Sequence, residues 1–297
     1  MGVAQLGVPP SGAMDLNALK IANRCVGNDV HEAGLEYTLV GPTIEFLGET
    51  VIAITGASVA AVVEPNSRKV PQNQAFHVKS GDVLIIGPTL GGARGYLAVQ
   101  GGLDVPLVLG SRSTLTRSQL GGYQGRALRA GDKINILSKP DLGSFACWQG
   151  EKRSRNTETL LIRVFPGSQS DLFTNEDIQA FFGQEYSLRP DSDRMGFRLA
   201  GEALRLSNGS DIASEPSFPG NIQIASSGLP IILGRDLPVT GGYAKIATIF
   251  AADFGDLAYL LPGQKLRFIP ATLDEAKAAL IHAEQSIETR FHNIEND

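Results

Sequence analysis

The sequence contains few residues of the kinds that staple or anchor a protein. Only two of its 297 residues are cysteines, Cys25 and Cys147, so a disulfide framework is excluded and a reducing cytoplasm is favoured. The four histidines are scattered without the spacing of metal ligands, and we expect no metal site. The most apolar segment, residues 83–102, contains Arg94 and a cluster of glycines. It therefore predicts two strands and a turn rather than a membrane span.

Charge and missing motifs exclude several further classes of protein. The formal net charge is -5 and the pI is about 5.5, so the basic surface typical of nucleic-acid binders is absent. The sequence has no P-loop, no strand–Gly-x-Gly-x-x-Gly–helix unit and no Gly-x-Ser-x-Gly elbow. The first residues lack a basic segment followed by an apolar run, so we expect no secretory signal.

Short β-branched runs between turn signals make up most of the chain. Their spacing predicts a mainly β protein, built as a barrel or sandwich, and not repeated βαβ units. The runs cover residues 43–48, 50–57, 81–88, 95–102, 132–137, 160–167, 221–226, 230–234, 246–253 and 265–271.

Three segments predict helices, at residues 14–26, 174–183 and 273–291. The second begins with Thr174 and Asp177 at capping-box spacing, and the third is preceded by Thr272 with Glu275 at the same spacing. An apolar stripe along the third predicts packing against the barrel wall. The stripe consists of Leu273, Ala276, Leu280, Ala283 and Ile287.

A basic, aperiodic segment near the middle of the chain predicts a linker at about residues 139–158. It divides the sequence into domains 1–145 and 146–297. A weak internal repeat relates residues 107–123 to residues 231–243, since both contain Leu-Gly followed by Gly-Gly-Tyr. Two related β-domains that arose by duplication are one explanation, and chance recurrence in a glycine-rich barrel is the other.

The first of three polar clusters lies in the opening stretch, "GVPPSGAMDLNALKIANRCVGN", and continues to Glu36. Asn is a poor helix former, yet Asn23 lies inside the predicted helix. Glu36 begins a predicted strand, where a carboxylate either bonds turn amides or points into a cavity as an acid, base or binding group. The other members of this cluster are Ser11, Asp15 and Asn28.

The second cluster is "SDRMGFRLAG", where Asp193 and Arg194 precede Met195 and Gly196. Arg194 is suited to a bidentate grip on a carboxylate, carbamate or phosphate. The alternative is an ordinary Asp–Arg surface pair, which is worth little energetically.

The third cluster is "SEPSFPGNIQIASSGLPIILGRDLPVTGGYAKIA". Its Gly-Gly pair lets a ligand approach backbone amides that could bind an oxyanion. A purely structural hairpin is the alternative. The polar and glycine residues of interest are Glu215, Gln223, Asp236, Thr240, Gly241, Gly242, Tyr243 and Lys245.

Together these motifs, with "LEYTLVGPTIEF" and "GYLAVQGGLDVPLVLGSRST", resemble the allophanate-hydrolase subunit 2 family over nearly the whole chain. The family includes the third subunit of bacterial 5-oxoprolinase, the Kip-inhibitor antagonist and the carboxyltransferase domain of urea carboxylase. The resemblance implies two cyclophilin-like β-barrel domains, with Ser11 and Asp15 near a pocket that the domains share. Family members usually carry a strand and a "QD-x-GR-x-G" segment before this turn, whereas only "MGVAQL" precedes Gly7 here.

Three functions follow from the resemblance. In the first, the chain joins a subunit 1-like partner and a lactam-opening subunit in a cytoplasmic 5-oxoprolinase, sharing ATP with these partners. In the second, it transfers a carboxyl group to urea or a related amide from biotin carried by another protein. In the third, it is a non-catalytic binding protein that antagonises a kinase inhibitor. For all three we expect a small-molecule or protein partner, no nucleic acid and no membrane.

For the enzyme functions we expect a shared pocket, with Glu36, Arg194, Gln223, Asp236 and Thr240 converging on one cavity at the junction of the two domains. Its catalytic residues would be Glu36, Arg194, Asp236 and Lys245, and its substrate-binding residues Ser11, Asp15, Gln223, Thr240, Gly241, Gly242 and Tyr243. Arg194 and Lys245 would offset phosphate charge. Because such a site is completed by another chain, the isolated chain should expose an apolar face.

Overall fold

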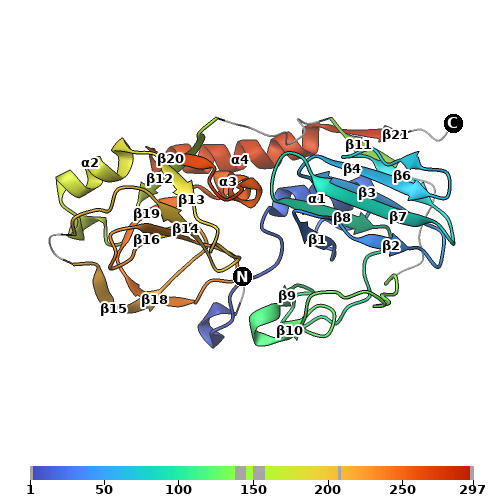
Figure 1. Cartoon of the computed structure of the whole chain (residues 1–297), viewed down its shortest axis with the longest axis horizontal. Coiled ribbons are helices and arrows are strands. Elements are labelled where there is room, and N and C mark those ends of the chain that lie inside the picture. The colour runs from blue at the N-terminus through green and yellow to red at the C-terminus, as the bar shows by residue number, and fades with distance from the viewer. Residues whose placement is uncertain (1–2, 138–144, 150–157, 207–208, 295–297) are drawn as a thin grey trace. The chain divides into compact units, whose positions relative to one another are not determined.

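The computed structural model describes residues 3–137, 145–149, 158–206 and 209–294 (Figure 1). Its contacts divide the chain into two compact units. Unit 1 consists of Met1–Met14 and Asn156–Glu284, and unit 2 consists of Asp15–Arg155 and Gln285–Asp297. This division differs from the predicted domains 1–145 and 146–297, because each terminal segment is grouped with the unit built from the other half of the chain.

Unit 2 is built around two four-stranded antiparallel sheets. One has the order β1 (Leu35–Thr38), β8 (Arg94–Val99), β3 (Thr50–Gly56), β6 (Ala75–Val78). The other has the order β2 (Thr43–Glu45), β7 (Val83–Thr89), β4 (Val59–Glu64), β5 (Arg68–Lys69). Apolar side chains of both sheets form a single buried cluster, so the core lies between the sheets.

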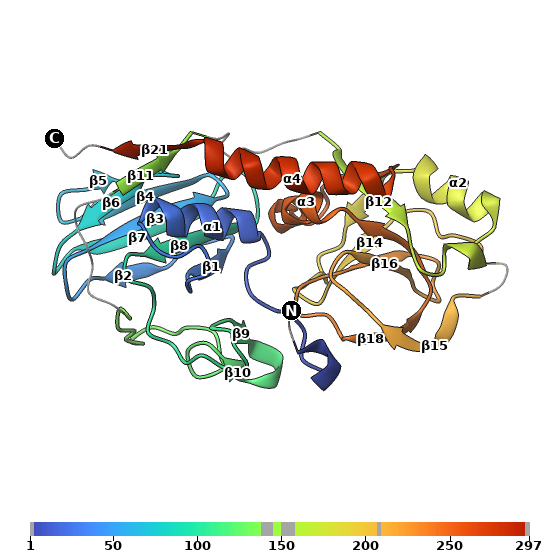
Figure 2. The ribbon, with the colours of Figure 1, turned by 180° about the vertical axis from the view of Figure 1, so that it is seen from behind.

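Helix α1 (Leu16–Cys25) covers the other face of the first sheet, against β3 and β8 (Figure 2). Alternate residues of β3 serve the two faces. Ile52 and Ile54 belong to the core between the sheets, while Val51 and Ala53 pack with the helix. A strand covered on both faces has no polar side, which explains why this segment is a continuous apolar run.

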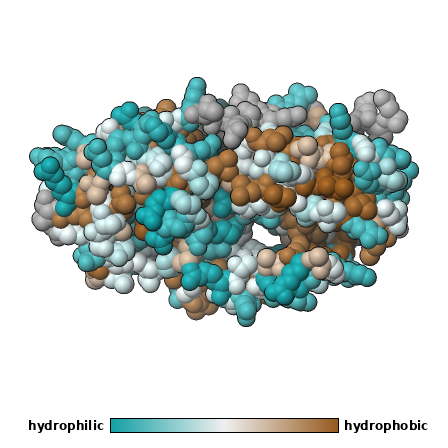
Figure 3. All heavy atoms as spheres, viewed as in Figure 1, coloured by the Kyte–Doolittle hydropathy of each residue, from teal (hydrophilic) through white to brown (hydrophobic). Residues whose placement is uncertain are grey.

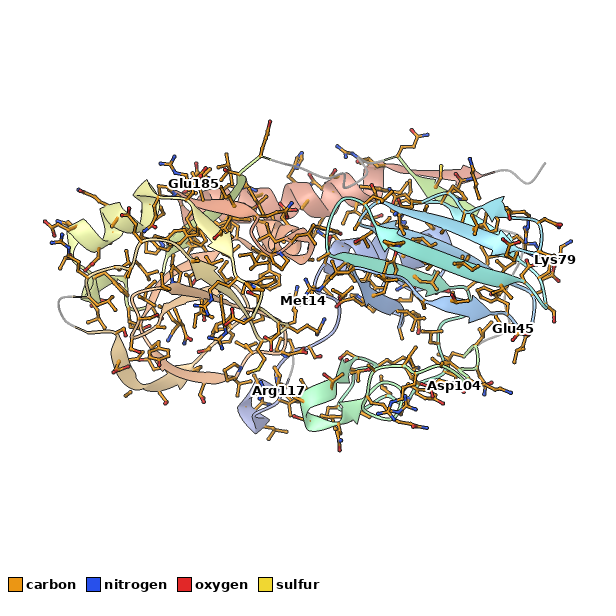
Figure 4. All side chains as sticks on the ribbon, viewed as in Figure 1. Met14, Glu45, Lys79, Asp104, Arg117 and Glu185 are labelled. Atoms are coloured by element: carbon orange, nitrogen blue, oxygen red, sulfur yellow. The ribbon has the colours of Figure 1, made fainter. Side chains whose placement is uncertain are left out.

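Shorter elements complete unit 2. Strands β9 (Thr114–Leu115) and β10 (Leu120–Gly121) pair around the 3-10 helix η2 (Thr116–Ser118), and Figure 4 labels Asp104 and Arg117 in this part of the chain. Strand β11 (Phe145–Trp148) pairs with β21 (Phe291–Ile294). Part of the predicted linker is therefore a strand, while its residues 139–144 and 150–157 lie outside the described residues. The strand predicted at 132–137 is wrong, because this segment forms only a bridge between Ile136 and Leu103.

Unit 1 contains a closed barrel, which confirms the mainly β class. Its strand order is β12 (Leu160–Pro166), β19 (Lys245–Ile249), β16 (Asn221–Ile224), β17 (Pro230–Leu233), β14 (Gly196–Ala200), β13 (Tyr186–Leu188), β20 (Lys265–Pro270). Parallel pairing of β20 with β12 closes the ring. Strands β15 (Asp211–Pro216) and β18 (Thr240–Tyr243) form a separate antiparallel ribbon, with a register irregularity in β15.

One helix of unit 1 also follows from local sequence, whereas a second one was not predicted. The capping box of Thr174 and Asp177 is present at the start of α2 (Asn175–Gly183), as predicted. Phe181 of this helix stacks on Phe268 of the barrel at a ring-centroid distance of 4.7 Å. The end of the run predicted at 246–253 is helical instead of extended, and forms α3 (Ala251–Phe254), which the 3-10 helix η4 (Gly255–Tyr259) follows. The remaining 3-10 helices among the described residues are η1 (Ala4–Leu6) and η3 (Ser170–Leu172).

Helix α4 (Leu273–Thr289) forms where it was predicted, but its apolar stripe is not a buried face. Leu273 is 54% exposed and Leu280 is 41% exposed. Near the end of the helix, Ile287 packs against the cluster that α1 forms with the first sheet. The prediction that the apolar stripe of α4 packs on the barrel wall is therefore wrong for the first turns of the helix.

The two segments of the weak repeat adopt different structures. Residues 107–123 form a loop and the β9–β10 pair, whereas residues 231–243 contribute to β17 and β18. These segments therefore give the duplication no structural support.

Large apolar side chains are exposed near the ends of β1 and β7. Leu39 is 47% exposed, Val40 is 60% exposed and Leu90 is 63% exposed. Figure 3 shows apolar residues gathered on the visible face of unit 2. Among the described residues, no helix is long and apolar enough to cross a membrane.

Candidate functional site

Arg194 ties the N-terminal segment to the barrel of unit 1. Its Nε donates to Asp236 Oδ2 at 2.8 Å and its Nη2 donates to Asp236 Oδ1 at 3.0 Å. The same Nη2 donates to the Gly12 carbonyl at 2.6 Å, and the Ser11 amide donates to the Arg235 carbonyl at 3.0 Å. The guanidinium thus grips a carboxylate in the bidentate manner expected of arginine, but the carboxylate belongs to the protein.

Local sequence explains how this pair is positioned. The neighbouring Asp193 serves the backbone, so the surface-pair alternative does not describe this motif. Its Oδ1 accepts hydrogen bonds from the amides of Met195 at 2.8 Å and Gly196 at 3.2 Å, which closes a tight turn. Gly234 allows the segment that carries Asp236 to approach the Arg194 backbone, because a Cβ at Gly234 would lie 2.3 Å from the Arg194 carbonyl oxygen.

A second group of polar side chains lies deep in unit 1. Ser217, Gln223 and Lys245 are 4%, 6% and 2% exposed. Ser217 Oγ, Gln223 Nε2 and Lys245 Nζ are all buried and have no hydrogen-bond partner among the described residues. A buried polar atom without a partner costs about 1–3 kcal/mol. Three such atoms in one unit therefore lower the stability of the fold, which favours a binding role over a purely structural one.

Strand pairing brings two of these side chains together, and the third lies beside Gly241. Gln223 of β16 and Lys245 of β19 are directly opposite each other in the barrel. Gly241 of β18 lies next to two of these polar atoms. A Cβ at this glycine would lie 2.3 Å from Gln223 Nε2 and 3.1 Å from Ser217 Oγ. The absence of a Cβ at Gly241 therefore allows Gln223 Nε2 to occupy the place that a Cβ would take.

Glu215 and Gln169 complete this group. Lys245 Nζ lies 3.6 Å from Glu215 Oε2, and the lysine side chain is 3% exposed while the glutamate side chain is 46% exposed. Gln169 Nε2 donates to the same Oε2 at 2.6 Å, and Gln169 Oε1 accepts from the Lys245 amide at 3.2 Å. Gln169 thereby holds the carboxylate beside the ammonium. We call Gln169, Glu215, Ser217, Gln223, Gly241 and Lys245 the barrel cluster.

Unit 2 contains a different polar group, around the start of α1. Asp15 caps the helix by accepting from the amides of Asn17 and Ala18, and its own amide donates to the Tyr96 hydroxyl oxygen at 2.8 Å. Arg94 Nε lies 3.7 Å from Glu36 Oε1. Burial, together with the negative charges of Glu36 and Asp15, raises the pKa of Tyr96 well above its ordinary value.

The asparagines of the opening stretch hold the loop after α1. Asn23 is fully buried, and its Nδ2 donates to the Glu32 carbonyl at 2.8 Å. Asn28 Nδ2 donates to Asn23 Oδ1 at 3.1 Å and to the Val99 carbonyl at 2.9 Å. A poor helix former lies in this helix because its amide replaces missing backbone partners.

The residues of the expected pocket are thus divided between the two units. Unit 2 holds Asp15 and Glu36, and unit 1 holds the other nine. In unit 1 the structure forms two groups, the Arg194–Asp236 pair with the Ser11 segment and the barrel cluster with Gln223, Gly241 and Lys245. Convergence of Glu36, Arg194, Gln223, Asp236 and Thr240 on one cavity stays a prediction. On β18, Thr240 is exposed, whereas Gly242 and Tyr243 are half-buried.

Sequence reasoning did not select several members of these groups. Gln169 and Ser217 had no motif, because a single Gln or Ser in a turn is too common to stand out. Arg94 and Tyr96 lie in the apolar segment 83–102, whose pattern predicts only strands and a turn. An arginine inside a strand that is otherwise buried was the available signal, since a buried charge requires a partner. Among the described residues, no three His, Cys, Asp or Glu side chains are grouped as metal ligands.

Comparison with known proteins places the chain in a family. A family model described as "Carboxyltransferase domain, subdomain A and B" matches residues 6–270. The chain is 36% identical over 300 residues to the third subunit of the Escherichia coli 5-oxoprolinase, a match that covers 98% of this chain and 93% of that protein. It is 34% identical to urea amidolyase of Saccharomyces cerevisiae over 94% of this chain, but that match spans only 16% of the yeast protein.

The solved structures agree with this placement. The crystal structure of urea amidolyase from K. lactis matches with a TM-score of 0.84 at 32% identity, over 98% of this chain and 18% of that one. The crystal structure of the Kluyveromyces lactis urea carboxylase matches with a TM-score of 0.82 at 33% identity, over 95% of this chain and 27% of that one. The chain therefore belongs to the family of carboxyltransferase domains, subdomains A and B.

Proposed function

We propose that the chain is the third subunit of an ATP-dependent 5-oxoprolinase. With a subunit 1-like partner it activates 5-oxoproline, and a lactam-opening subunit then releases glutamate. The observation that carries this proposal is the match to a 5-oxoprolinase subunit of Escherichia coli at 36% identity, over 98% of this chain and 93% of that protein. The match to the yeast urea amidolyase, at 34% identity, spans only 16% of that protein.

The exposed apolar side chains of unit 2 support a partner. Leu39, Val40 and Leu90 are each about half exposed or more. Single exposed leucines are ordinary, whereas several on one unit favour a surface that another chain covers. The two units themselves we propose to be cyclophilin-like, as the family resemblance implies, and the complex to act in the cytoplasm.

The barrel cluster does not fit the triphosphate of ATP. Lys245 is already paired with Glu215, and Arg194 is already paired with Asp236. A polyphosphate would bring several negative charges to side chains whose positive charge is neutralised within the same unit. We therefore no longer expect Arg194 and Lys245 to offset phosphate charge.

Carboxyl transfer is the second candidate function. The family model is described as a carboxyltransferase domain, and the K. lactis urea amidolyase matches with a TM-score of 0.84. In that case biotin carried by another protein would deliver the carboxyl group to an amide nitrogen. Similarity to the urea amidolyases favours carboxyl transfer. Similarity to the 5-oxoprolinase subunits favours the 5-oxoprolinase function.

Reconstitution separates the two functions. The chain, its subunit 1-like partner and the lactam-opening subunit of the same organism are purified separately and mixed. We expect the chain to co-purify with the subunit 1-like partner and ADP to form only when 5-oxoproline is present. Urea-dependent consumption of a carboxyl group from a biotinylated carrier, with no response to 5-oxoproline, would contradict the first function and support the second.

A further inference from the structure

We propose that the barrel cluster is a binding subsite for one uncharged amide oxygen, the carbonyl of a lactam or carboxamide, and that it rejects phosphate. This inference rests on the proposed function, because it assigns the ring amide of the substrate to a particular set of atoms. It departs from the phosphate-binding role that the sequence had suggested for the same lysine.

The unpartnered atoms define what the subsite binds. Gln223 Nε2 and Lys245 Nζ can only donate hydrogen bonds, and Ser217 Oγ can donate one. All three side chains are more than nine-tenths buried, so bulk water does not satisfy them. A group with an acceptor oxygen and no charge would take these bonds without bringing an uncompensated ion into the barrel.

Charge decides between a carbonyl and a phosphate. The Lys245 ammonium lies 3.6 Å from the Glu215 carboxylate, so the pair carries no net charge. Gln169 fixes this balance, since it donates to the carboxylate and accepts from the Lys245 amide. The negative charge of Glu215 would repel an entering phosphate, whereas it would not repel a neutral carbonyl group.

Gly241 and Glu215 border the same donors. A Cβ on Gly241 would lie 2.3 Å from Gln223 Nε2 and 3.1 Å from Ser217 Oγ, so the glycine lets the β18 backbone pass close to both donors. Glu215 is directly opposite Gly241 in the β15–β18 ribbon and its side chain is 46% exposed. The solvent-exposed part of the barrel cluster is therefore the Glu215 side chain.

The binding test uses the full chain and two probes, 2-pyrrolidinone, a γ-lactam without the carboxylate, and inorganic phosphate. The readout is the side-chain amide resonance of Gln223 in the 15N-labelled protein, assigned by its loss in Gln223→Ala. We expect a saturable shift with 2-pyrrolidinone and none with phosphate at equal ionic strength. A shift with phosphate only, or with neither probe because a water molecule fills the space, would overturn the proposal.

Two variants and one control make the test specific. Gly241→Ala puts a methyl group among the donors and should weaken 2-pyrrolidinone binding by ten-fold or more. The matched control is Gly183→Ala, because a Cβ at Gly183 meets none of the described atoms within 4 Å. If Gly241→Ala does not fold, as judged by circular dichroism, Ser217→Ala removes one donor and should weaken binding several-fold. Unchanged affinity in the folded variants would refute the subsite.

The two experiments distinguish a failure of the subsite from a failure of the proposed function. If the reconstituted complex cleaves ATP with 5-oxoproline but 2-pyrrolidinone binds Gly241→Ala as it binds the original chain, the subsite is wrong and the function stands. If 2-pyrrolidinone binds as expected and no 5-oxoproline-dependent ATP cleavage occurs, the subsite stands and the function is wrong.

Discussion

Replacing Lys245 by methionine should stabilise the free chain but lower the activity of the reconstituted complex. The Lys245 side chain is 3% exposed, and its Nζ makes no hydrogen bond to any described residue. The neighbouring Glu215 carboxylate is 46% exposed and also accepts a hydrogen bond from Gln169. Methionine keeps most of the apolar stem of lysine and discards the buried charge, while the glutamate retains water and one hydrogen bond.

The expected gain follows from two opposing terms. At the observed 3.6 Å the ion pair is worth about 5 kcal/mol in a medium of effective dielectric constant of about 20. Contact of Glu215 with solvent reduces this attraction, and burying the ammonium costs several kcal/mol. Replacing buried ion pairs by apolar residues is often neutral or stabilising by about 1–4 kcal/mol. We expect a gain of about 1 kcal/mol, or a rise in Tm of roughly 2–4 °C for a domain of 150–250 residues.

Differential scanning calorimetry with circular dichroism is the appropriate assay, because the single tryptophan, Trp148, belongs to unit 2 and would not report on the barrel. Lys265→Met is the matched control. Its partner is Glu185, and the two side chains are 62% and 42% exposed, so its removal should change stability by less than about 0.5 kcal/mol. A loss of about 2 kcal/mol or more in Lys245→Met would refute the reasoning, since it would mean that the ammonium is well satisfied in the free chain.

Three further predictions concern other contacts. Arg194→Lys keeps the charge but loses the bidentate grip, so hydrogen exchange of the Ser11 amide should accelerate about ten-fold or more; an unchanged rate would show that this pair does not hold the N-terminal segment. The Arg126 guanidinium lowers the pKa of Asp132 to about 2 in the folded chain, so this pair adds stability above about pH 4 and loses it as the pH falls through 2. Carbon-13 NMR titration of the Asp132 carboxyl checks this value, and a midpoint near 4 would contradict it. Burial raises the pKa of the Cys25 thiol to about 12, so native protein at pH 8 should leave Cys25 unmodified by iodoacetamide in a mass-spectrometric assay, whereas rapid native labelling would contradict its burial.

Local signals were enough for much of the fold. The capping residue Thr174 and the β-branched runs of the barrel specify their elements through contacts with near neighbours in sequence. Grouping of the termini with opposite units could not be predicted, because it depends on contacts between segments far apart in sequence. The linker prediction failed at Phe145–Trp148 for the same reason, since this strand exists through pairing with Phe291–Ile294.

The candidate site was predictable in residue type but not in partnership. Motifs selected Arg194, Asp236 and Lys245, because polar residues among glycines and apolar strands are unusual. The sequence did not indicate that Arg194 and Asp236 would bind each other, a contact between residues 42 positions apart. Likewise no pattern identified Gln169 as the residue that holds Glu215 beside the lysine. Such pairings arise from barrel register, which a one-dimensional pattern does not contain.

Glutamate formation from 5-oxoproline by the reconstituted complex tests the proposed function most directly. The chain, the subunit 1-like partner and the lactam-opening subunit are combined with ATP, and glutamate and ADP are measured together. We expect both products only when all three chains are present, and a loss of on the order of ten-fold or more in kcat/KM with Lys245→Met. Equal glutamate formation without this chain, or with the Lys245→Met variant, would contradict the central claim.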